Sequence, residues 1–285
     1  MLLMVSVSSG RSQSKKILFQ TGKGEIDYTC KTADAEKNIH IYYYIPEGDI
    51  KSMPVQIVMH GMGRNGDGYY KVWEKQADKY GFILLVPTFS NEQFAEASYQ
   101  QGNIMRSNGK FNKKADMTYT IVDDIFDYFI EHSNSKANMF NIYGHSAGAQ
   151  FVHRYLLFGN PKVNKAIAAN AGWYTFPTDT TAFPYGIGNA QKEIGINVSE
   201  FYSRDLTILL GDADTLRTSN LRQTPEADRQ GLNRLERGNA FYTFCKKDAR
   251  EKGVPFNWKI NYVSGSSHSN SKMAPMAAEL IYGKK

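Results

Sequence analysis

The stretch Phe140–Tyr155, FNIYGHSAGAQFVHRY, places Gly144, Ser146 and Gly148 where an apolar, strand-like segment gives way to a helical one. Small residues at such a corner let a turn pack tightly against a sheet. They also allow a serine to be held on a strained turn, with its hydroxyl exposed as a nucleophile and the first amides of the helix facing the developing negative charge. We interpret the corner as a nucleophile site, with an inert tight turn as the alternative.

Outward from this corner, buried strands and helices alternate along the chain. This alternation predicts an α/β fold with a mostly parallel central sheet covered by helices on both faces, preceded by an N-terminal hairpin. The irregular stretch 175–204 is long enough to be a functional lid, or else a surface insertion. The last expected helix tolerates Pro275 if that residue falls in its first turn. The expected elements are a hairpin at 25–46, strands at 55–61, 82–89, 139–146, 165–172, 205–214 and 256–265, and helices at 69–81, 117–133, 147–159, 226–253 and 272–283.

Composition limits the classes of function. The 285 residues are 41% hydrophobic and 22% charged, which is ordinary for a folded protein with a sizeable core. The net charge of +6 is scattered, without a basic strip interleaved with aromatics, which argues against nucleic-acid binding. No apolar run reaches the ~18 residues of a membrane span. The oligomeric state stays open.

The first residues and the two cysteines bear on location. Residues 1–16 combine a short apolar run with small residues, typical of the remnant of a signal peptide or of a disordered tail. We therefore expect an exported protein, periplasmic or secreted, with residues 25–285 as a single domain. Cys30 and Cys245 are too few for a disulfide framework or a metal site, and they are either free buried thiols or one long-range disulfide.

A serine nucleophile needs a base and an orienting acid, and in elbow-type enzymes both follow the serine in the chain. Of the six histidines, only His268 follows the corner in a loop after a strand, within VSGSSHSNSKM. The segment TILLGDADT ends a strand with Asp212 and Asp214. Its spacing favours Asp214 as the acid, with Asp212 or a paired-carboxylate calcium site as alternatives.

Two backbone amides should stabilise the oxyanion. Ala147, directly after the serine, supplies one, and Met62, in the loop after strand 55–61, supplies the other, with Gly63 as second choice. The same loop contains a formal G-x-G-x-x-G at 61–66. A dinucleotide site would also need an acidic residue near the end of the next strand, and FILLVPTF has none.

These motifs together resemble the α/β-hydrolases over residues 25–285. Within that superfamily, the chain is similar to exported esterases related to poly(3-hydroxybutyrate) depolymerases and feruloyl esterases. The resemblance implies Ser146 as nucleophile, Asp214 as acid and His268 as base. Many relatives have a Gly-x-Gly-His turn where this chain has GSSH, a departure that changes the loop but keeps the base. The matching segments are HGMGRNG, YGHSAGAQFVHRY, AANAGWYTFP, LLGDADT and GSSHSNSKM.

Aromatic residues should line the pocket. Trp173 and Tyr174 follow a strand and so fall at the carboxyl edge of the sheet, where open α/β folds bind ligands. With Phe183 and Tyr185 they are candidates for an aromatic wall, and Arg64 for the border of the cleft. Ordinary loop packing is the alternative.

The leading hypothesis is a serine esterase that hydrolyses small-molecule or polymeric esters through an acyl-enzyme, with no metal or cofactor. Peptidase or acyltransferase chemistry at the same triad is a second hypothesis, although the length leaves no room for a large gating domain. A non-catalytic binding protein on a hydrolase fold is the third.

Overall fold

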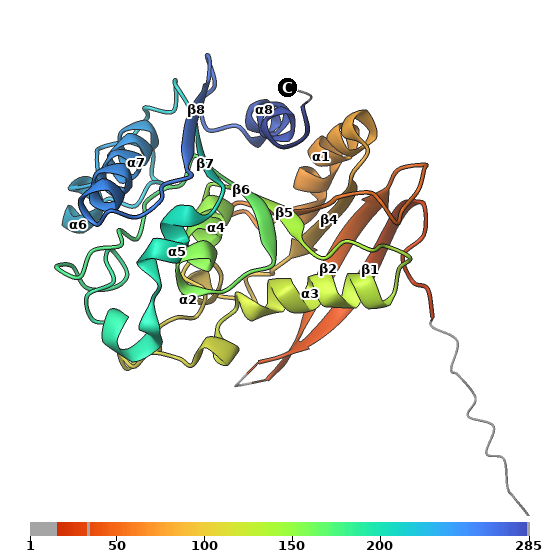
Figure 1. The fold of residues 1–285 in the computed structure, drawn as a ribbon, viewed down its shortest axis with the longest axis horizontal. Coiled ribbons are helices and arrows are strands. Elements are labelled where there is room, and N and C mark those ends of the chain that lie inside the picture. Colours follow the sequence, from red (N-terminus) through yellow and green to blue (C-terminus); the bar gives the residue numbers. More distant parts are fainter. Residues whose placement is uncertain (1–15, 33–34, 284–285) are drawn as a thin grey trace, which may run out of the picture.

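The computed structural model describes residues 16–32 and 35–283, and all its named strands form one sheet in the order β1-β2-β4-β3-β5-β6-β7-β8 (Figure 1). β1 pairs with β2, and β2 with β4, in antiparallel fashion, and the remaining pairs are parallel. The strands are β1 Gly22–Lys31, β2 Glu36–Ile45, β3 Val55–Met59, β4 Ile83–Thr88, β5 Phe140–His145, β6 Val163–Ala169, β7 Leu206–Gly211 and β8 Lys259–Val263.

Helices follow most of the parallel strands, so the predicted fold class is confirmed, including the N-terminal hairpin. The irregular stretch 175–204 contains a short π-helix, Gln191–Gly195, and one α-helix near its end. The α-helices are α1 Gly66–Tyr80, α2 Glu96–Tyr99, α3 Thr120–Glu131, α4 Ala147–Phe158, α5 Val198–Ser203, α6 Pro225–Asp228, α7 Arg234–Glu251 and α8 Asn270–Tyr282, and a 3₁₀ turn spans Lys114–Asp116.

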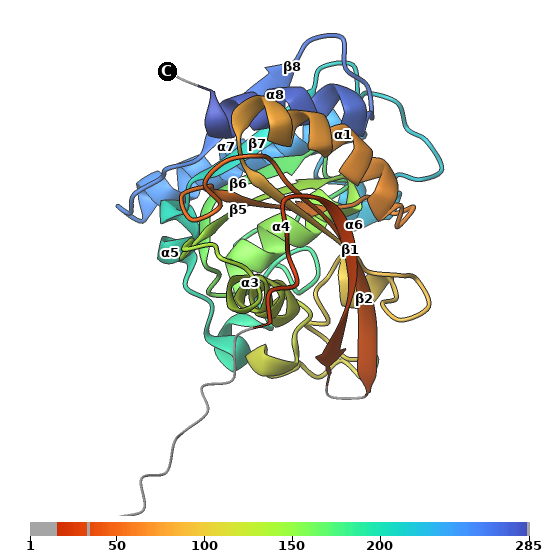
Figure 2. The same ribbon diagram turned by 90° about the vertical axis from the view of Figure 1, so that its right-hand side faces the viewer.

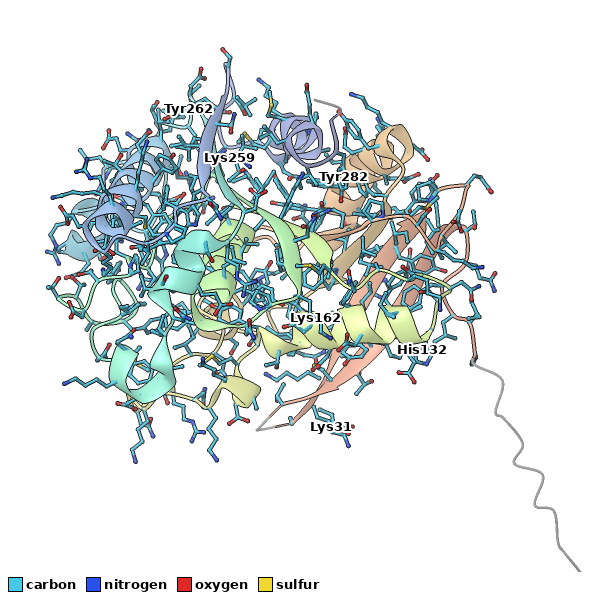
Figure 3. The ribbon with its side chains drawn as sticks, in the orientation of Figure 1. Lys31, His132, Lys162, Lys259, Tyr262 and Tyr282 are labelled. Atoms are coloured by element: carbon cyan, nitrogen blue, oxygen red, sulfur yellow. The ribbon has the colours of Figure 1, made fainter. Side chains whose placement is uncertain are left out.

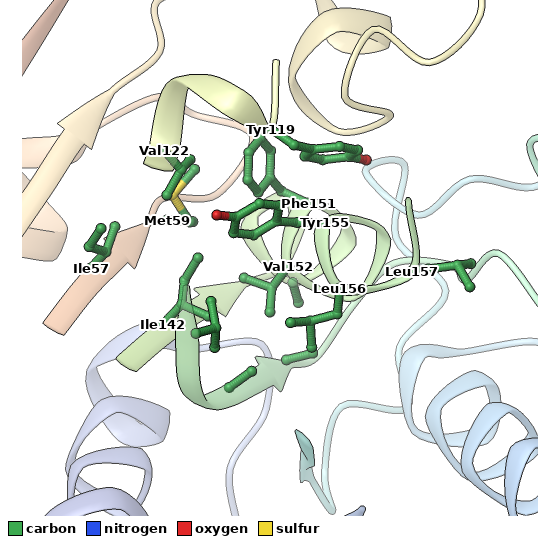
Figure 4. Close-up of a cluster of buried hydrophobic side chains, with 14 of the residues drawn as sticks. Ile57, Met59, Tyr119, Val122, Ile142, Phe151, Val152, Tyr155, Leu156 and Leu157 are labelled. Atoms are coloured by element: carbon green, nitrogen blue, oxygen red, sulfur yellow. The ribbon is translucent and has the colours of Figure 1, made fainter. Parts of the chain in front are cut away.

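The helices cover both faces of the sheet (Figures 1 and 2). On one face α1 and α8 pack together over the parallel strands, with Trp73 and Ala277 fully buried. The other face carries α3, α4 and α7, and Figure 4 shows Phe151 and Tyr155 of α4 near Val122 of α3. This double covering explains why the central strands read as continuous apolar runs.

The carboxyl-terminal helix is tied to the sheet by polar contacts as well. The hydroxyl of Tyr282 (Figure 3) accepts a hydrogen bond from Asn141 Nδ2 at 3.0 Å and donates to Gln56 Oε1 at 3.1 Å. Pro275 is the sixth residue of α8, so it lies past the first turn where we expected it. The closing helix therefore continues with one backbone hydrogen bond fewer.

Three further sequence expectations concern the N-terminal residues, the two cysteines and membrane-spanning helices. The predicted leader or tail, residues 1–16, lies outside the described residues except for Lys16. Cys30 and Cys245 are both free and buried. Within 16–32 and 35–283, no helix is both long and apolar enough to cross a membrane.

Candidate active site

Ser146 lies on a strained corner between β5 and α4. Its backbone has φ 57° and ψ −115°, a combination that L-residues rarely adopt. The flanking glycines are required by close packing. A Cβ on Gly144 would lie 2.1 Å from the carbonyl oxygen of Gly148, and one on Gly148 would lie 2.2 Å from that of Met59. The sequence therefore folds here into a corner that projects the serine hydroxyl from the sheet edge.

The structure brings together the three residues proposed as a triad. The Nε2 atom of His268 is 2.9 Å from Ser146 Oγ, and His268 Nδ1 donates a hydrogen bond to Asp214 Oδ2 at 2.8 Å. They come from three loops at the carboxyl ends of β5, β7 and β8. Ser146 and His268 face the solvent in part, whereas Asp214 is buried. An imidazole bridged in this way can accept the serine proton.

A buried arginine, which sequence reasoning missed, holds the other oxygen of Asp214. Arg234, the first residue of α7, places Nη1 3.6 Å from Asp214 Oδ1, and both side chains are only 3% exposed. Burial lowers the pKa of Arg234, and the nearby carboxylate opposes that shift. The pair fixes the carboxylate in one orientation. In sequence, this arginine is indistinguishable from the other charges of a polar helix.

Two further polar side chains, Asp212 and Asn170, form hydrogen bonds to the backbone of the loops that carry the triad residues. Asp212 is exposed, and its Oδ1 accepts a hydrogen bond from the backbone N–H of Gly265 at 2.7 Å. Asn170, also missed, follows β6 with φ 49°. Its Oδ1 accepts from the Gly211 N–H at 2.8 Å, and its Nδ2 donates to Ser267 O at 3.5 Å. The asparagine after strand 163–169 was the available signal, because Asn tolerates a left-handed backbone.

A second histidine packs against the first. The ring centroids of His145 and His268 are 4.6 Å apart, with planes tilted by 33°. His145 Nδ1 is 2.9 Å from the hydroxyl of Tyr69, a buried residue of α1. Burial holds the pKa of His145 well below its usual value, so the ring is neutral beside His268. It supports the imidazole without adding a second positive charge.

The loop after β3 is held in place by buried side-chain contacts of Tyr99 and Arg64. Tyr99 donates its hydroxyl proton to the carbonyl of His60 at 2.7 Å, and the two rings stack with centroids 4.7 Å apart. Arg64, with φ 54°, donates from Nη1 to Phe89 O at 2.8 Å and lies over the Tyr99 ring. Arg64 is therefore a buried support of the loop and does not line the cavities beside Ser146, where the sequence placed it.

The two amides expected to bind an oxyanion are available. Ala147 is the first residue of α4, so its N–H has no acceptor within the helix. Met62 lines the cleft beside Ser146, with 46% of its surface exposed. Over the described part of the chain, no residue accepts a hydrogen bond from either N–H.

Two cavities flank Ser146. The larger, about 400 Å³, extends towards Trp173 and is lined mostly by polar residues. The smaller, about 200 Å³, lies on the side of His268 and His145. Met62, Ser146, Asn220 and Arg234 contribute to both. One cleft thus offers separate space on either side of the serine hydroxyl.

The aromatic residues expected in the pocket have different positions. Trp173 lines the larger cavity. Tyr185 lies behind it, with ring centroids 4.9 Å apart. Phe183 packs edge-on against Phe158 in the core. Tyr174 is fully buried, and its ring stacks on a phenylalanine of α7. The aromatic wall is therefore a single tryptophan, because the chain turns inward immediately after it.

In the described part of the chain, no group of three or more His, Cys, Asp or Glu side chains is placed to hold a metal ion. Neither protein-family models nor curated protein sequences gave a match to this chain.

Solved structures do match. Poly(aspartic acid) hydrolase-1 from Sphingomonas sp. KT-1 is 34% identical, with a TM-score of 0.86 over 93% of this chain and 100% of that one. LpqC, a poly(3-hydroxybutyrate) depolymerase from Bordetella parapertussis, is 30% identical, with a TM-score of 0.86 over 92% of this chain and 90% of that one. An S-formylglutathione hydrolase from Staphylococcus aureus, 14% identical with a TM-score of 0.55 over 92% of this chain and 98% of that one, shares the fold.

The chain belongs to the α/β-hydrolase superfamily, in the group that contains the poly(aspartic acid) hydrolase and the poly(3-hydroxybutyrate) depolymerase. The resemblance stated from the sequence motifs is thereby confirmed. Membership in this group supports hydrolase activity.

Proposed function

We propose that this protein is a serine hydrolase that cleaves carboxylic esters through an acyl-enzyme. The observation that carries the proposal is the connected series from Ser146 Oγ through His268 to Asp214, with steps of 2.9 and 2.8 Å, beside an open cleft. Each member has the geometry that its role requires.

In the first half-reaction, Ser146 Oγ attacks the ester carbonyl while His268 Nε2 takes its proton. Asp214 holds the imidazole in the tautomer with Nδ1–H and stabilises its charged form. The N–H groups of Met62 and Ala147 donate to the oxyanion, each contributing roughly 3 kcal/mol to transition-state stabilisation.

In the second step, His268 returns the proton to the leaving alkoxide, and the alcohol departs. The leaving group therefore occupies the smaller cavity, which His268 lines, and the acyl group occupies the larger cavity, which it does not. Water activated by His268 then hydrolyses the acyl-enzyme and frees Ser146.

Amide hydrolysis at the same triad is a second candidate, favoured by the neighbour whose name is poly(aspartic acid) hydrolase. An amine leaving group needs protonation by His268 before it departs, a step that this geometry equally provides. Acyl transfer to an alcohol would use the same acyl-enzyme, and a binding protein would use none of these steps. Relative rates on matched esters and amides, with and without added alcohol, separate these reactions.

The test is a p-nitrophenyl ester chain-length series on the wild type, on Ser146→Ala and on Ser52→Ala. Ser52 is the control because it is exposed and precedes β3, at the opposite end of the strand from the oxyanion loop. We expect a fall of about 10⁴-fold or more in kcat for Ser146→Ala and none for the control. Labelling of the wild type by a fluorophosphonate, located by peptide mass analysis, should map to Ser146. A protein that neither turns over esters nor labels would favour the binding-protein hypothesis.

A further inference from the structure

The larger cavity contains a fixed cation. Arg222 lines it, with its guanidinium carbon 4.8 Å from the ring centroid of Trp173. Its Nε donates a hydrogen bond to the Tyr185 hydroxyl at 2.8 Å, and that hydroxyl is also 2.6 Å from Thr224 Oγ1. An arginine held by a ring face and a hydroxyl loses little side-chain entropy on binding a ligand.

A second cation lies behind the wall of the cavity. Arg154 of α4 is fully buried, with its guanidinium carbon 4.0 Å from the Trp173 centroid. Its hydrogen-bond acceptors are neutral: Thr175 Oγ1 at 2.8 Å and the carbonyls of Gln100 and Gln150, both of which line the cavity, at 3.0 and 3.1 Å.

No described acid forms an ion pair with Arg154, and its buried Nη2 has no hydrogen-bond partner in the described chain. Burial lowers the pKa of Arg154 to about 9, which still leaves it charged at neutral pH. Burying an unpaired charge is costly. The chain keeps this charge directly behind the surface that faces the acyl group.

The acids around the cavity do not balance these charges. Glu96 contacts Arg222 at 3.3 Å, but its side chain is 56% exposed, and exposed pairs of this kind contribute little. Arg234 also lines the cavity and is engaged with Asp214. Arg222 and Arg234 are therefore each accompanied by one carboxylate, whereas Arg154 has none among the described residues. The excess positive charge lies on the side of the cavity where Arg154 and Arg222 are.

We propose that the larger cavity binds a carboxylate carried by the acyl group of the substrate, with Arg222 contacting it and Arg154 supplying a buried positive potential. The proposal rests on the serine-hydrolase function above and names its substrate class: esters or amides of dicarboxylic acids. Trp173, Leu221 and Met62 supply the apolar contacts for the methylenes between the two carbonyl carbons. The carboxylate of the bound substrate then pairs with Arg222 and lies in the positive potential of the buried Arg154.

The test compares two esters of one shape. 4-Nitrophenyl hydrogen adipate carries a terminal carboxylate, and 4-nitrophenyl 6-methylheptanoate replaces it with an isopropyl group. We expect the wild type to favour the adipate by about tenfold or more in kcat/KM, since charged hydrogen bonds contribute this much. Arg222→Gln should remove most of that preference, mainly by raising KM for the adipate ester. The preference should also decrease with added salt.

Two further variants test whether the preference depends on the charge at Arg222 itself. Arg229→Gln removes one exposed positive charge that lies outside this cavity, and should keep the preference. Glu96→Gln removes the acid that competes for Arg222, and should increase it. Equal kcat/KM for both esters in the wild type, or a preference that survives Arg222→Gln, would overturn the carboxylate site while leaving the hydrolase proposal intact. Inactivity on both esters together with no fluorophosphonate labelling of Ser146 would instead overturn the hydrolase proposal itself.

Discussion

Asp212 Oδ1 accepts a hydrogen bond from the backbone N–H of Gly265 at 2.7 Å, while Asp214, two residues on, accepts one from His268 Nδ1 at 2.8 Å. Both carboxylates thus hold the loop between β8 and α8, one through its backbone and the other through the imidazole. Their burial separates the roles, because Asp212 is exposed and Asp214 is buried.

This division predicts different effects of two identical substitutions. Asp214→Asn keeps the shape of the side chain but favours the wrong imidazole tautomer, so kcat should fall by about 10⁴-fold. Asp212→Asn keeps an oxygen that can accept from Gly265, so kcat should stay within a few-fold of the wild type. Steady-state kinetics on one p-nitrophenyl ester, with circular dichroism to verify folding, measures both. Comparable losses in the two variants would contradict this assignment.

The packing at the serine corner predicts the effect of adding a single methyl group. In Gly148→Ala, the new Cβ would meet the carbonyl oxygens of Met59 and His60 at 2.2 and 2.8 Å, so α4 must shift away from the oxyanion loop. We expect at least a 100-fold loss of kcat, in line with the cost of a misplaced oxyanion donor, and a lower melting temperature.

Gly63→Ala is the control for the same loop region, because its Cβ would meet only Asn65 Oδ1 at 3.6 Å, an ordinary contact. This variant should keep its melting temperature and most of its activity. Were Gly148→Ala to match it in both measurements, the corner would not be as tightly packed as the distances indicate.

Asn170 predicts a smaller, graded effect. Asn170→Ala removes the acceptor for the Gly211 N–H and places an alanine at φ 49°. The free energy of unfolding should fall by about 1–3 kcal/mol, and kcat should fall because the loops carrying Asp214 and His268 lose a shared anchor. Asn170→Asp keeps the acceptor for the Gly211 N–H, so its free energy of unfolding and its kcat should lie between those of the wild type and of Asn170→Ala. Urea unfolding and ester kinetics on the same samples provide the comparison, and an unchanged kcat in Asn170→Ala would show that the anchor has no role in positioning.

The sequence sufficed for those parts of the fold and site that depend on local pattern. The alternation of strands and helices predicted the covered sheet, and the Gly-x-Ser-x-Gly corner, the strand-end aspartates and the last histidine indicated three residues that the structure brings together. Arg234 and Arg154 could not be found this way, because their importance comes from burial against Asp214 and Trp173. Tyr174 was expected in the pocket since it follows a strand, but the chain turns inward after Trp173.

Two of the buried histidines outside the triad, His60 and His153, predict how stability depends on pH. His60 accepts the Phe89 N–H at Nε2 (3.0 Å) and donates from Nδ1 to the Gly61 carbonyl (3.0 Å). His153 accepts the Thr175 N–H at Nε2 (3.1 Å) and donates from Nδ1 to its own helix. A ring nitrogen that accepts a backbone N–H cannot also carry a proton, so both rings are fixed in the neutral form.

Burial lowers the pKa of His60 from 6.5 to about 4 and that of His153 well below its usual value. Between these values and 6.5 the unfolded chain binds protons that the folded chain does not, so stability is complete above about pH 6.5 and is lost as the pH falls. For His60, the free energy of unfolding that is lost once the pH is below its folded-state pKa is about 3 kcal/mol. The midpoint of urea unfolding should be lower at pH 5 than at pH 7. The decrease should be smaller in His153→Gln than in the wild type, because the variant has one histidine fewer to protonate. Equal wild-type midpoints at the two pH values would mean that neither ring is held neutral by the fold.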